Sequence, residues 1–520
     1  MRGVETVLFL VVVATIVATF ARRLRVPAPS LLVVAGLVAG LLPGVSEIQV
    51  TPDVVGLVVL PPLLYAAGEE LPWRDLRAVW KPVTALAVGL VIASAAAVGG
   101  VVVAITGLPI GLALVLGTVL ASTDPVAVSA LGRRLSLPPR VRALVQAESL
   151  FNDATSLLLF RVAVAAAVTV GAVSWSHVAV DFVVLAGGGA AIGLVVGWGV
   201  VLIRGRIADP VLETVVALVT PYLAYVAAES VHGSGVTAVV VASVLIGART
   251  AGRTAPRIRI QIDAVYQTVV FLLESVVFAL IGLELPTLVR ALSRQGPTWL
   301  LQALAITATL IVVRALWVFP MSALTARGSA RKRSWRVPAV VSWAGARGVV
   351  PLAAALSIPL TTDSGAPLPG RDLILLLATA VIVITLVVQG FTLAPLVRRA
   401  GVAQAPADLR HEDTVARLHV ARAGLDHLEE LADSDIAPDG VVDQLRVRLQ
   451  AHVDRIEADR AEDGAAEDGS AVYRRLRRDI LAVQRDELAR LFQVGTIGDS
   501  TRRRVERDLD LEDARLGEDL

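Results

Sequence analysis

The 520-residue sequence has no cysteine, little charge and few aromatic side chains. The absence of cysteine excludes disulfide frameworks, thiol nucleophiles, iron–sulfur clusters and Cys-ligated zinc. Charged residues make up 18% of the chain, whereas about 25% is usual in a soluble protein. The apolar share is 55%. This composition predicts a protein that lies mostly within a membrane.

The few charges are unevenly spread. Residues 1–403 hold 30 Lys and Arg against 18 Asp and Glu, whereas residues 404–520 hold 18 against 28. We therefore expect a membrane domain over 1–403 and an acidic cytoplasmic tail over 404–520. The tail has apolar residues at helical spacing and no catalytic constellation, which indicates a mainly helical, regulatory part. The basic excess is typical of arginines that flank a membrane, so no nucleic-acid partner is expected.

Long apolar segments set the expected fold. A spanning helix needs about 20 mostly apolar residues, because hydrocarbon cannot satisfy free backbone groups. Cutting the chain at charge clusters and at Gly and Pro predicts an all-α polytopic membrane protein with about 13 transmembrane helices. The expected segments are 4–21, 28–44, 53–68, 81–106, 108–131, 141–171, 176–203, 208–229, 234–248, 263–286, 298–325, 337–360 and 372–397.

The positions of basic residues predict the orientation. One alternate set of connections, which includes Arg74, Arg77 and Lys81, holds 21 Lys and Arg, and the opposite set holds four. Positive residues stay on the cytoplasmic side. We therefore expect the N-terminus outside, the tail inside and a multi-pass location in the plasma membrane.

Polar and charged residues interrupt three of the apolar segments. Ionisable groups at membrane depth are costly unless they are paired or hydrated, so by default they mark a transport pathway. If Arg347 neutralises one carboxylate of the sixth segment, the other must be satisfied by a mobile charge, either a proton or a metal cation. The three motifs are Ser122-Thr123-Asp124-Pro125, Glu148-Ser149-Leu150-Phe151-Asn152-Asp153 and Gly345-Ala346-Arg347-Gly348.

Two of these segments are expected to be interrupted helices. Pro125 lacks an amide donor and clashes with the carbonyl of Ala121, so the fifth helix should break there. Gly345, Gly348 and Pro351 predict a similar break in the twelfth helix. Broken helices in corresponding positions are typical of secondary transporters built from inverted repeats.

The combination of motifs resembles the sodium/proton exchanger family of the monovalent cation/proton antiporter superfamily. The resemblance covers roughly residues 4–400 and implies a homodimer with a mobile core of helices 4 to 6 and 11 to 13. Two further markers are Leu60-Pro61-Pro62-Leu63-Leu64-Tyr65 and Ile281-Gly282-Leu283-Glu284-Leu285.

The resemblance also implies residue roles. Asp153 matches the aspartate that binds ion and proton in turn, and Asn152 is its neighbour. Together with Asp153, the expected Na⁺ ligands are Ser149, Asp124 and the Thr123 backbone carbonyl. Glu148 and Arg347 match a core ion pair, and Glu274 is expected to pair with Arg314 or Arg161.

These observations predict a secondary transporter, not an enzyme. It would exchange Na⁺ in the first place, or else Li⁺ or K⁺, for H⁺ with no cofactor beyond the transported ions, and serve pH homeostasis. The family resemblance implies electroneutral exchange, which it associates with the pair Asn152 and Asp153 where relatives have two adjacent aspartates. Two alternatives stay open at this point: a cation channel that uses the same acids, and a membrane sensor whose working part is the tail.

Overall fold

The chain forms two compact units, Met1–Gln404 and Ala405–Leu520. The computed structural model describes most residues from 55 to 517 and isolated positions between 12 and 38. The remaining gaps are 125–136, 169–174, 208, 251–253, 293–297, 326–334, 363–364, 404–405, 434–438, 462–465, 495 and 497–498. The first two expected membrane segments therefore lie almost entirely outside the described residues.

The described part of the first unit is helical apart from its connections and one isolated bridge between Thr361 and Pro367. Seven of its helices are long and apolar enough to cross a membrane. The all-α membrane fold is confirmed, while the count of 13 helices and the inverted repeat stay predictions. The elements are η1 (Val55–Val59), α4 (Leu60–Glu69), α5 (Trp73–Thr84), η2 (Ala85–Leu90), α6 (Val91–Thr106), α7 (Ile110–Ala121), α9 (Pro139–Val168), α10 (Trp175–Arg204), α11 (Pro210–Ser230), α12 (Gly235–Thr250), α13 (Pro256–Leu292), α14 (Thr298–Thr325), α15 (Arg336–Trp343), α16 (Val349–Leu356) and α17 (Arg371–Ala400), with η1 and η2 being π-helical.

Helix α5 corrects one expectation. The basic residues of this stretch indicate a connection, but the structure continues α5 through η2 and α6 as one helical stretch, Trp73–Thr106. The reason is amphipathic spacing: apolar residues three and four apart form one buried stripe, while the basic side chains stay exposed. The buried residues are Leu76, Val79 and Val83.

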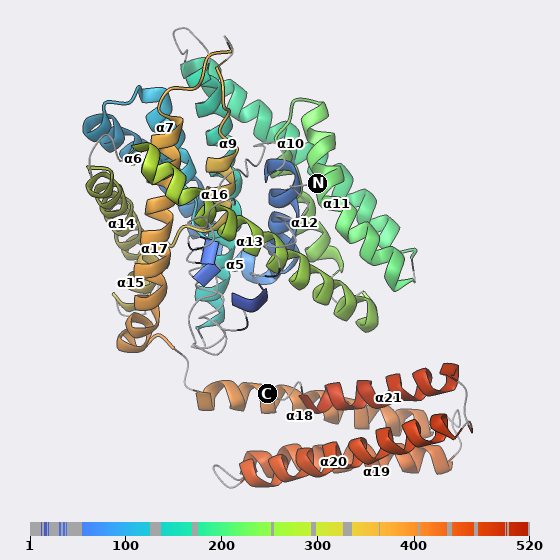
Figure 1. Ribbon diagram of the computed structural model, residues 1–520. Coiled ribbons are helices and arrows are strands. Elements are labelled where there is room, and N and C mark those ends of the chain that lie inside the picture. Colours follow the sequence, from blue (N-terminus) through green and yellow to red (C-terminus); the bar gives the residue numbers. More distant parts are fainter. Residues whose placement is uncertain are drawn as a thin grey trace. The chain divides into compact units, whose positions relative to one another are not determined.

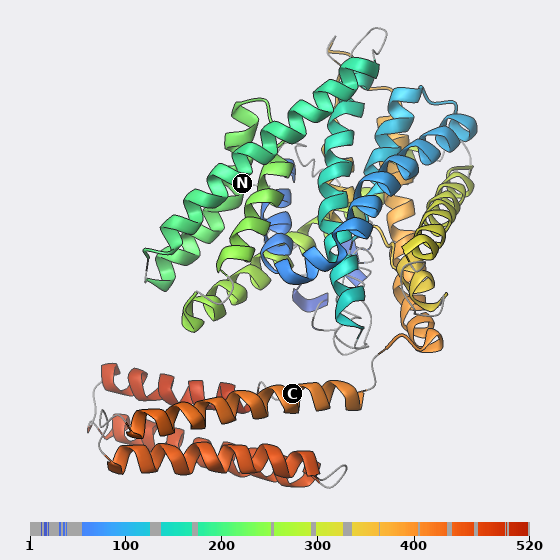
Figure 2. The same cartoon turned by 180° about the vertical axis from the view of Figure 1, so that it is seen from behind.

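The helices of this unit pack as two bundles (Figures 1 and 2). The core bundle consists of α5, η2, α6, α7, α9, α14, α15, α16 and α17, which contact one another extensively. The scaffold bundle consists of α4, α10, α11 and α12. Helix α13 packs against both, and α9 is the core helix that faces the scaffold through α10 and α12. The core bundle contains the described parts of the segments that the resemblance assigns to a mobile core, 4 to 6 and 11 to 13, while its mobility stays a prediction.

Close packing in the scaffold bundle depends on small residues. Three glycines spaced four apart on α10 face α12, and a Cβ at Gly193 would lie 2.4 Å from the backbone oxygen of Ala238. Because lipid offers no hydrophobic drive for helix association, such close backbone approach supplies the van der Waals contact that holds the pair. The other two glycines are Gly189 and Gly197.

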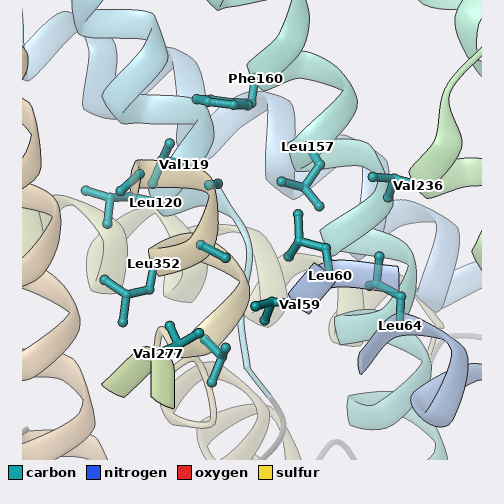
Figure 3. Close-up of a cluster of buried hydrophobic side chains, with 14 of the residues drawn as sticks. Val59, Leu60, Leu64, Val119, Leu120, Leu157, Phe160, Val236, Val277 and Leu352 are labelled. Carbon is teal, nitrogen blue, oxygen red and sulfur yellow. The ribbon is translucent and has the colours of Figure 1, made fainter. Parts of the chain in front are cut away.

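Apolar side chains surround the middle of α9. Figure 3 shows Leu157 and Phe160 of α9 among side chains from α4, α7, α12, α13 and α16. Leu120 and Leu352 in this cluster are almost completely buried. Polar groups of α9 that lie one turn before Leu157 therefore face a largely apolar interior.

The second unit is helical, as expected for the tail. Its helices are α18 (Pro406–Asp433), α19 (Asp439–Ala461), α20 (Ala466–Gln493) and α21 (Asp499–Gly517). Helices α18 and α19 pack as one pair, and α20 and α21 as another. The first pair is held by a small apolar cluster that includes Leu418 and Ile456, and by an ion pair between Arg422 and Glu457.

Candidate functional site

Helix α7 ends where the sequence predicts a break. It stops at Ala121, and Ser122 has an extended backbone with φ −72° and ψ 149°. Ala121 is the residue whose carbonyl a proline at position 125 would meet in a continuous helix. Pro125 and the expected second half of this helix lie outside the described residues. The end of α7 leaves Ser122, Thr123 and Asp124 as non-helical, buried residues.

A second interruption separates α15 from α16. Residues 344–348 are non-helical, which confirms the break expected at the Gly345–Gly348 motif. The structure adds a steric reason for both glycines. A Cβ at Gly345 would lie 2.7 Å from Cδ of Arg314, and one at Gly348 would lie 1.4 Å from Oδ2 of Asp124. These glycines therefore make room for two charged side chains.

The two interruptions touch each other. The amide of Asp124 donates to the carbonyl of Ala346 over 2.8 Å. The amide of Val349, the first residue of α16, donates to Oδ2 of Asp124 over 3.1 Å. The carboxylate therefore lies at the positive end of α16, which stabilises its charge.

Helix α9 presents its polar stripe to the end of α7. The hydroxyl of Ser149 donates to the carbonyl of Thr123 over 2.6 Å, and Nδ2 of Asn152 donates to the Thr123 hydroxyl over 2.6 Å. One turn further along, Ser156 donates to the carbonyl of Thr118 over 2.7 Å. The spacing of these residues along α9 places the expected ligands Ser149 and Thr123 in direct contact.

Asp153 lies beside this contact with an unused oxygen. It sits near the middle of α9, its residue is 6% exposed, and its Oδ1 has no hydrogen-bond partner. The buried hydroxyl of Ser122 lies within reach of this carboxylate but makes no well-formed hydrogen bond. Asp124 and Arg347 are close enough to Asp153 to act on it electrostatically. An unbonded carboxylate oxygen in such surroundings is costly unless a proton or a cation completes it.

The structure gives Glu148 a different partner from the expected one. Its carboxylate is paired in bidentate fashion with Arg314 of α14, with Nη1–Oε1 at 2.5 Å and Nη2–Oε2 at 3.0 Å. Both side chains are almost fully buried: that of Arg314 is 3% exposed and that of Glu148 is 1% exposed. The pairing of Glu148 with Arg347 that the resemblance implies is not observed. Instead, Arg347 is buried with its Nε and Nη1 unbonded, and its amide donates to the hydroxyl of Thr385.

Sequence reasoning missed this role of Arg314. The sequence does contain a signal for this role, because Arg314 lies in the middle of an apolar segment. From the sequence, however, Arg314 is expected as a possible partner of Glu274. Arg161, the other candidate partner, pairs with Glu229. Neither arginine is therefore the partner of Glu274.

Comparison with known proteins decides the family. A model of the transmembrane sodium/hydrogen exchanger family matches residues 9–399. The chain belongs to the sodium/hydrogen exchanger family. An uncharacterized Na⁺/H⁺ exchanger of Mycobacterium tuberculosis is 34% identical over 99% of this chain and 96% of its own length. The Na⁺/H⁺ antiporter ApNhaP of Aphanothece halophytica is 30% identical over 79% of this chain and 77% of its own.

A solved structure shows the same fold. The sodium proton antiporter MjNhaP1 of Methanocaldococcus jannaschii superposes with a TM-score of 0.63 at 20% identity, over 77% of this chain and 99% of its own. As a member of the sodium/hydrogen exchanger family, this protein is a multi-pass membrane transporter that exchanges a cation for a proton, and it is not an enzyme.

Proposed function

We propose that this exchanger carries Na⁺ and H⁺ in alternation on the carboxylate of Asp153. The observation that carries the proposal is the buried Oδ1 of Asp153, which has no hydrogen-bond partner, with the hydroxyl of Ser122 within reach of the same carboxylate. Ser149, Thr123 and Asp124 supply further oxygen atoms next to it, and oxygen ligands suit a hard cation. Asn152 holds the hydroxyl of Thr123 in place.

Competition for one carboxylate makes the transport an exchange. A bare carboxylate cannot be buried in an apolar surrounding without a large cost. The site therefore changes from facing one side of the membrane to facing the other only when Asp153 holds a proton or a cation. A proton and a cation cannot occupy Asp153 together, so each crossing of one is coupled to a return of the other.

The surrounding charges favour electroneutral exchange. Arg314 balances Glu148, which leaves Asp124, Asp153 and Arg347 as charged groups nearest the site. The buried Glu274 of α13 is a further ionisable group, close enough to act on Asp124. One bound Na⁺ or one bound proton balances this group in the same way. The two loaded forms then carry equal charge, so the membrane potential should not drive either direction.

Exchange in proteoliposomes tests the assignment. An imposed Na⁺ gradient should drive counter-movement of protons in the native protein, and Asp153→Asn should abolish it. Asp263→Asn, which removes an exposed carboxylate of α13, is the matched control and should retain exchange. Normal exchange by Asp153→Asn would refute the role of this residue. Repeating the assay with Li⁺ and K⁺ determines which cations the site accepts.

Two further measurements separate the proposal from its alternatives. A potential set with potassium and valinomycin should leave the exchange rate unchanged, whereas a channel would show current in bilayer recordings. Truncation after residue 403 should retain exchange, whereas a sensor that works through its tail would lose its function.

We also propose that the protein works as a homodimer in the plasma membrane, with the N-terminus outside and the tail inside. The excess of basic residues on one set of connections supports the orientation. Labelling of single cysteines placed in opposite loops, and the mass of the purified protein in detergent, test the two points separately.

A further inference from the structure

A polar cluster outside the candidate site joins three helices. Nη1 of Arg161 lies 2.5 Å from Oε1 of Glu229, and Nη2 donates to the hydroxyl of Tyr225 over 2.8 Å. The guanidinium also lies 5.8 Å from the centre of the Tyr225 ring. The amide of Gly235, the first residue of α12, donates to the same Glu229 oxygen over 3.0 Å. Glu229 is therefore held by α11 and α12 independently of Arg161.

The cluster joins the two bundles. Arg161 belongs to α9 of the core bundle, whereas Tyr225 and Glu229 belong to α11 of the scaffold bundle. Arg161 follows Asp153 by eight residues on one continuous helix, which is about 12 Å along its axis. Any movement of Asp153 together with α9 therefore moves Arg161 relative to Glu229.

The position of the cluster identifies the side of the membrane. It lies near the end of α9, in the last turns of α11 and at the start of α12. The opposite ends of these helices adjoin the basic residues Arg140, Arg206 and Arg249. Because basic residues mark the cytoplasmic side, the cluster lies toward the external side.

We propose that Arg161, Glu229 and Tyr225 form a latch that closes the external route to Asp153 and opens in each transport cycle. The proposal rests on the proposed function, because exchange on Asp153 requires access from both sides in turn. Opening the external route to Asp153 requires α9 to separate from α11. Hydrogen bonds of 2.5 and 2.8 Å do not survive such a separation.

The environment of the latch suits repeated opening. The side chains of Arg161 and Glu229 are 29% and 37% exposed. An accessible ion pair toward the external ends of its helices contributes little net stability where water replaces the lost contacts when it breaks. The buried pair of Glu148 and Arg314 lies wholly within the core bundle and has no such compensation, so it should stay intact through the cycle.

Cross-linking tests the latch directly, because the native chain contains no cysteine. Arg161→Cys with Glu229→Cys supplies the only two thiols, and a short bis-methanethiosulfonate reagent spans the gap left by the shorter side chains. Exchange in proteoliposomes should fall at least tenfold on cross-linking and return on reduction. The same reagent on either single variant should have no such effect.

A second pair controls for cross-linking as such. Gln302 donates to the carbonyl of Ile105 over 3.1 Å, which joins α14 to α6 within the core bundle at the same side of the membrane. Cross-linked Gln302→Cys with Ile105→Cys should exchange at the uncross-linked rate. Undiminished exchange by the cross-linked Arg161 and Glu229 pair would overturn the latch.

Charge variants give a second test, the KM for the cation on each side of the membrane. A purely structural role of the pair would not change these KM values. Arg161→Gln and Glu229→Gln should weaken the closed state, so the KM for cation supplied from outside should fall about threefold or more while the KM from inside rises. The charge-swapped Arg161→Glu with Glu229→Arg should restore both values. If both KM values are unchanged in the folded charge variants, the latch is refuted. The proposed function is tested separately: it is refuted if the Asp153→Asn variant still exchanges Na⁺ for H⁺.

Discussion

The pairing of Glu148 with Arg314 makes a quantitative prediction about stability. Glu148→Gln removes the charge that balances Arg314, while Arg314 keeps two hydrogen bonds to the carbonyl of Val341. Both partners are nearly inaccessible to water, so the remaining guanidinium cannot be hydrated without opening the core bundle. Removing one partner of a buried pair costs about 3–5 kcal/mol, and we expect Glu148→Gln to lose about this much.

A double-mutant cycle separates this pair from the one expected from the family. Arg314→Met leaves Glu148 buried and unbalanced, so it should also cost about 3–5 kcal/mol. The double variant leaves neither charge, and its loss should be smaller than the sum by about 2–3 kcal/mol. The corresponding cycle of Glu148 with Arg347→Met should give a coupling below about 1 kcal/mol, because no hydrogen bond joins those two side chains in the described structure.

Unfolding of the purified protein by SDS in mixed detergent micelles supplies the free energies. Each variant is compared with the native protein under one set of conditions, so that errors of extrapolation cancel. A larger coupling for Arg347 than for Arg314 would refute the assignment of the ion pair. Exposed Asp263→Asn should change the free energy of unfolding by less than about 0.5 kcal/mol and serves as the control.

Two glycines lead to further predictions. Gly348→Ala should abolish Na⁺/H⁺ exchange in proteoliposomes, because the added Cβ would overlap Oδ2 of Asp124. Gly390 has open space around it, so the control variant Gly390→Ala should exchange normally in the same assay. Gly193→Ala should lower the free energy of unfolding by about 1–3 kcal/mol, because its Cβ would lie 2.4 Å from the backbone oxygen of Ala238 and push α10 away from α12. Unaltered SDS unfolding of Gly193→Ala would contradict the close packing.

The membrane helices could be predicted closely because their signal is local. The apolar segments expected at 176–203 and 298–325 appear as Trp175–Arg204 and Thr298–Thr325. Length and charge alone define such segments. The segment expected at 81–106 begins earlier, at Trp73, because the exposed basic residues of 73–80 resemble a connection. Only the packing shows that Leu76 and Val79 on the opposite face are buried.

The candidate site could be predicted in part. The spacing of Ser149 and Asn152 places both on faces of α9 that meet Thr123, and Pro125 predicts the end of α7. The partner of Glu148 could not be predicted. Two arginines were available, and the choice depends on how α14 approaches α9, a contact between segments 166 residues apart.

The arrangement of neighbours distinguishes Asp153 from Glu148 and Asp124, the two other acids of the sequence motifs. Arg314 neutralises Glu148, and the amide of Val349 at the positive end of α16 binds Asp124. Asp153 has neither a salt bridge nor a partner for Oδ1 in the described structure. The fixed groups thus satisfy two carboxylates and leave the third dependent on a charge that can arrive and depart. Asp153 and Arg161 share helix α9, so the proposed ion-binding carboxylate and the proposed external latch lie on one continuous helix. In this proposal, a displacement of α9 at either residue also displaces the other.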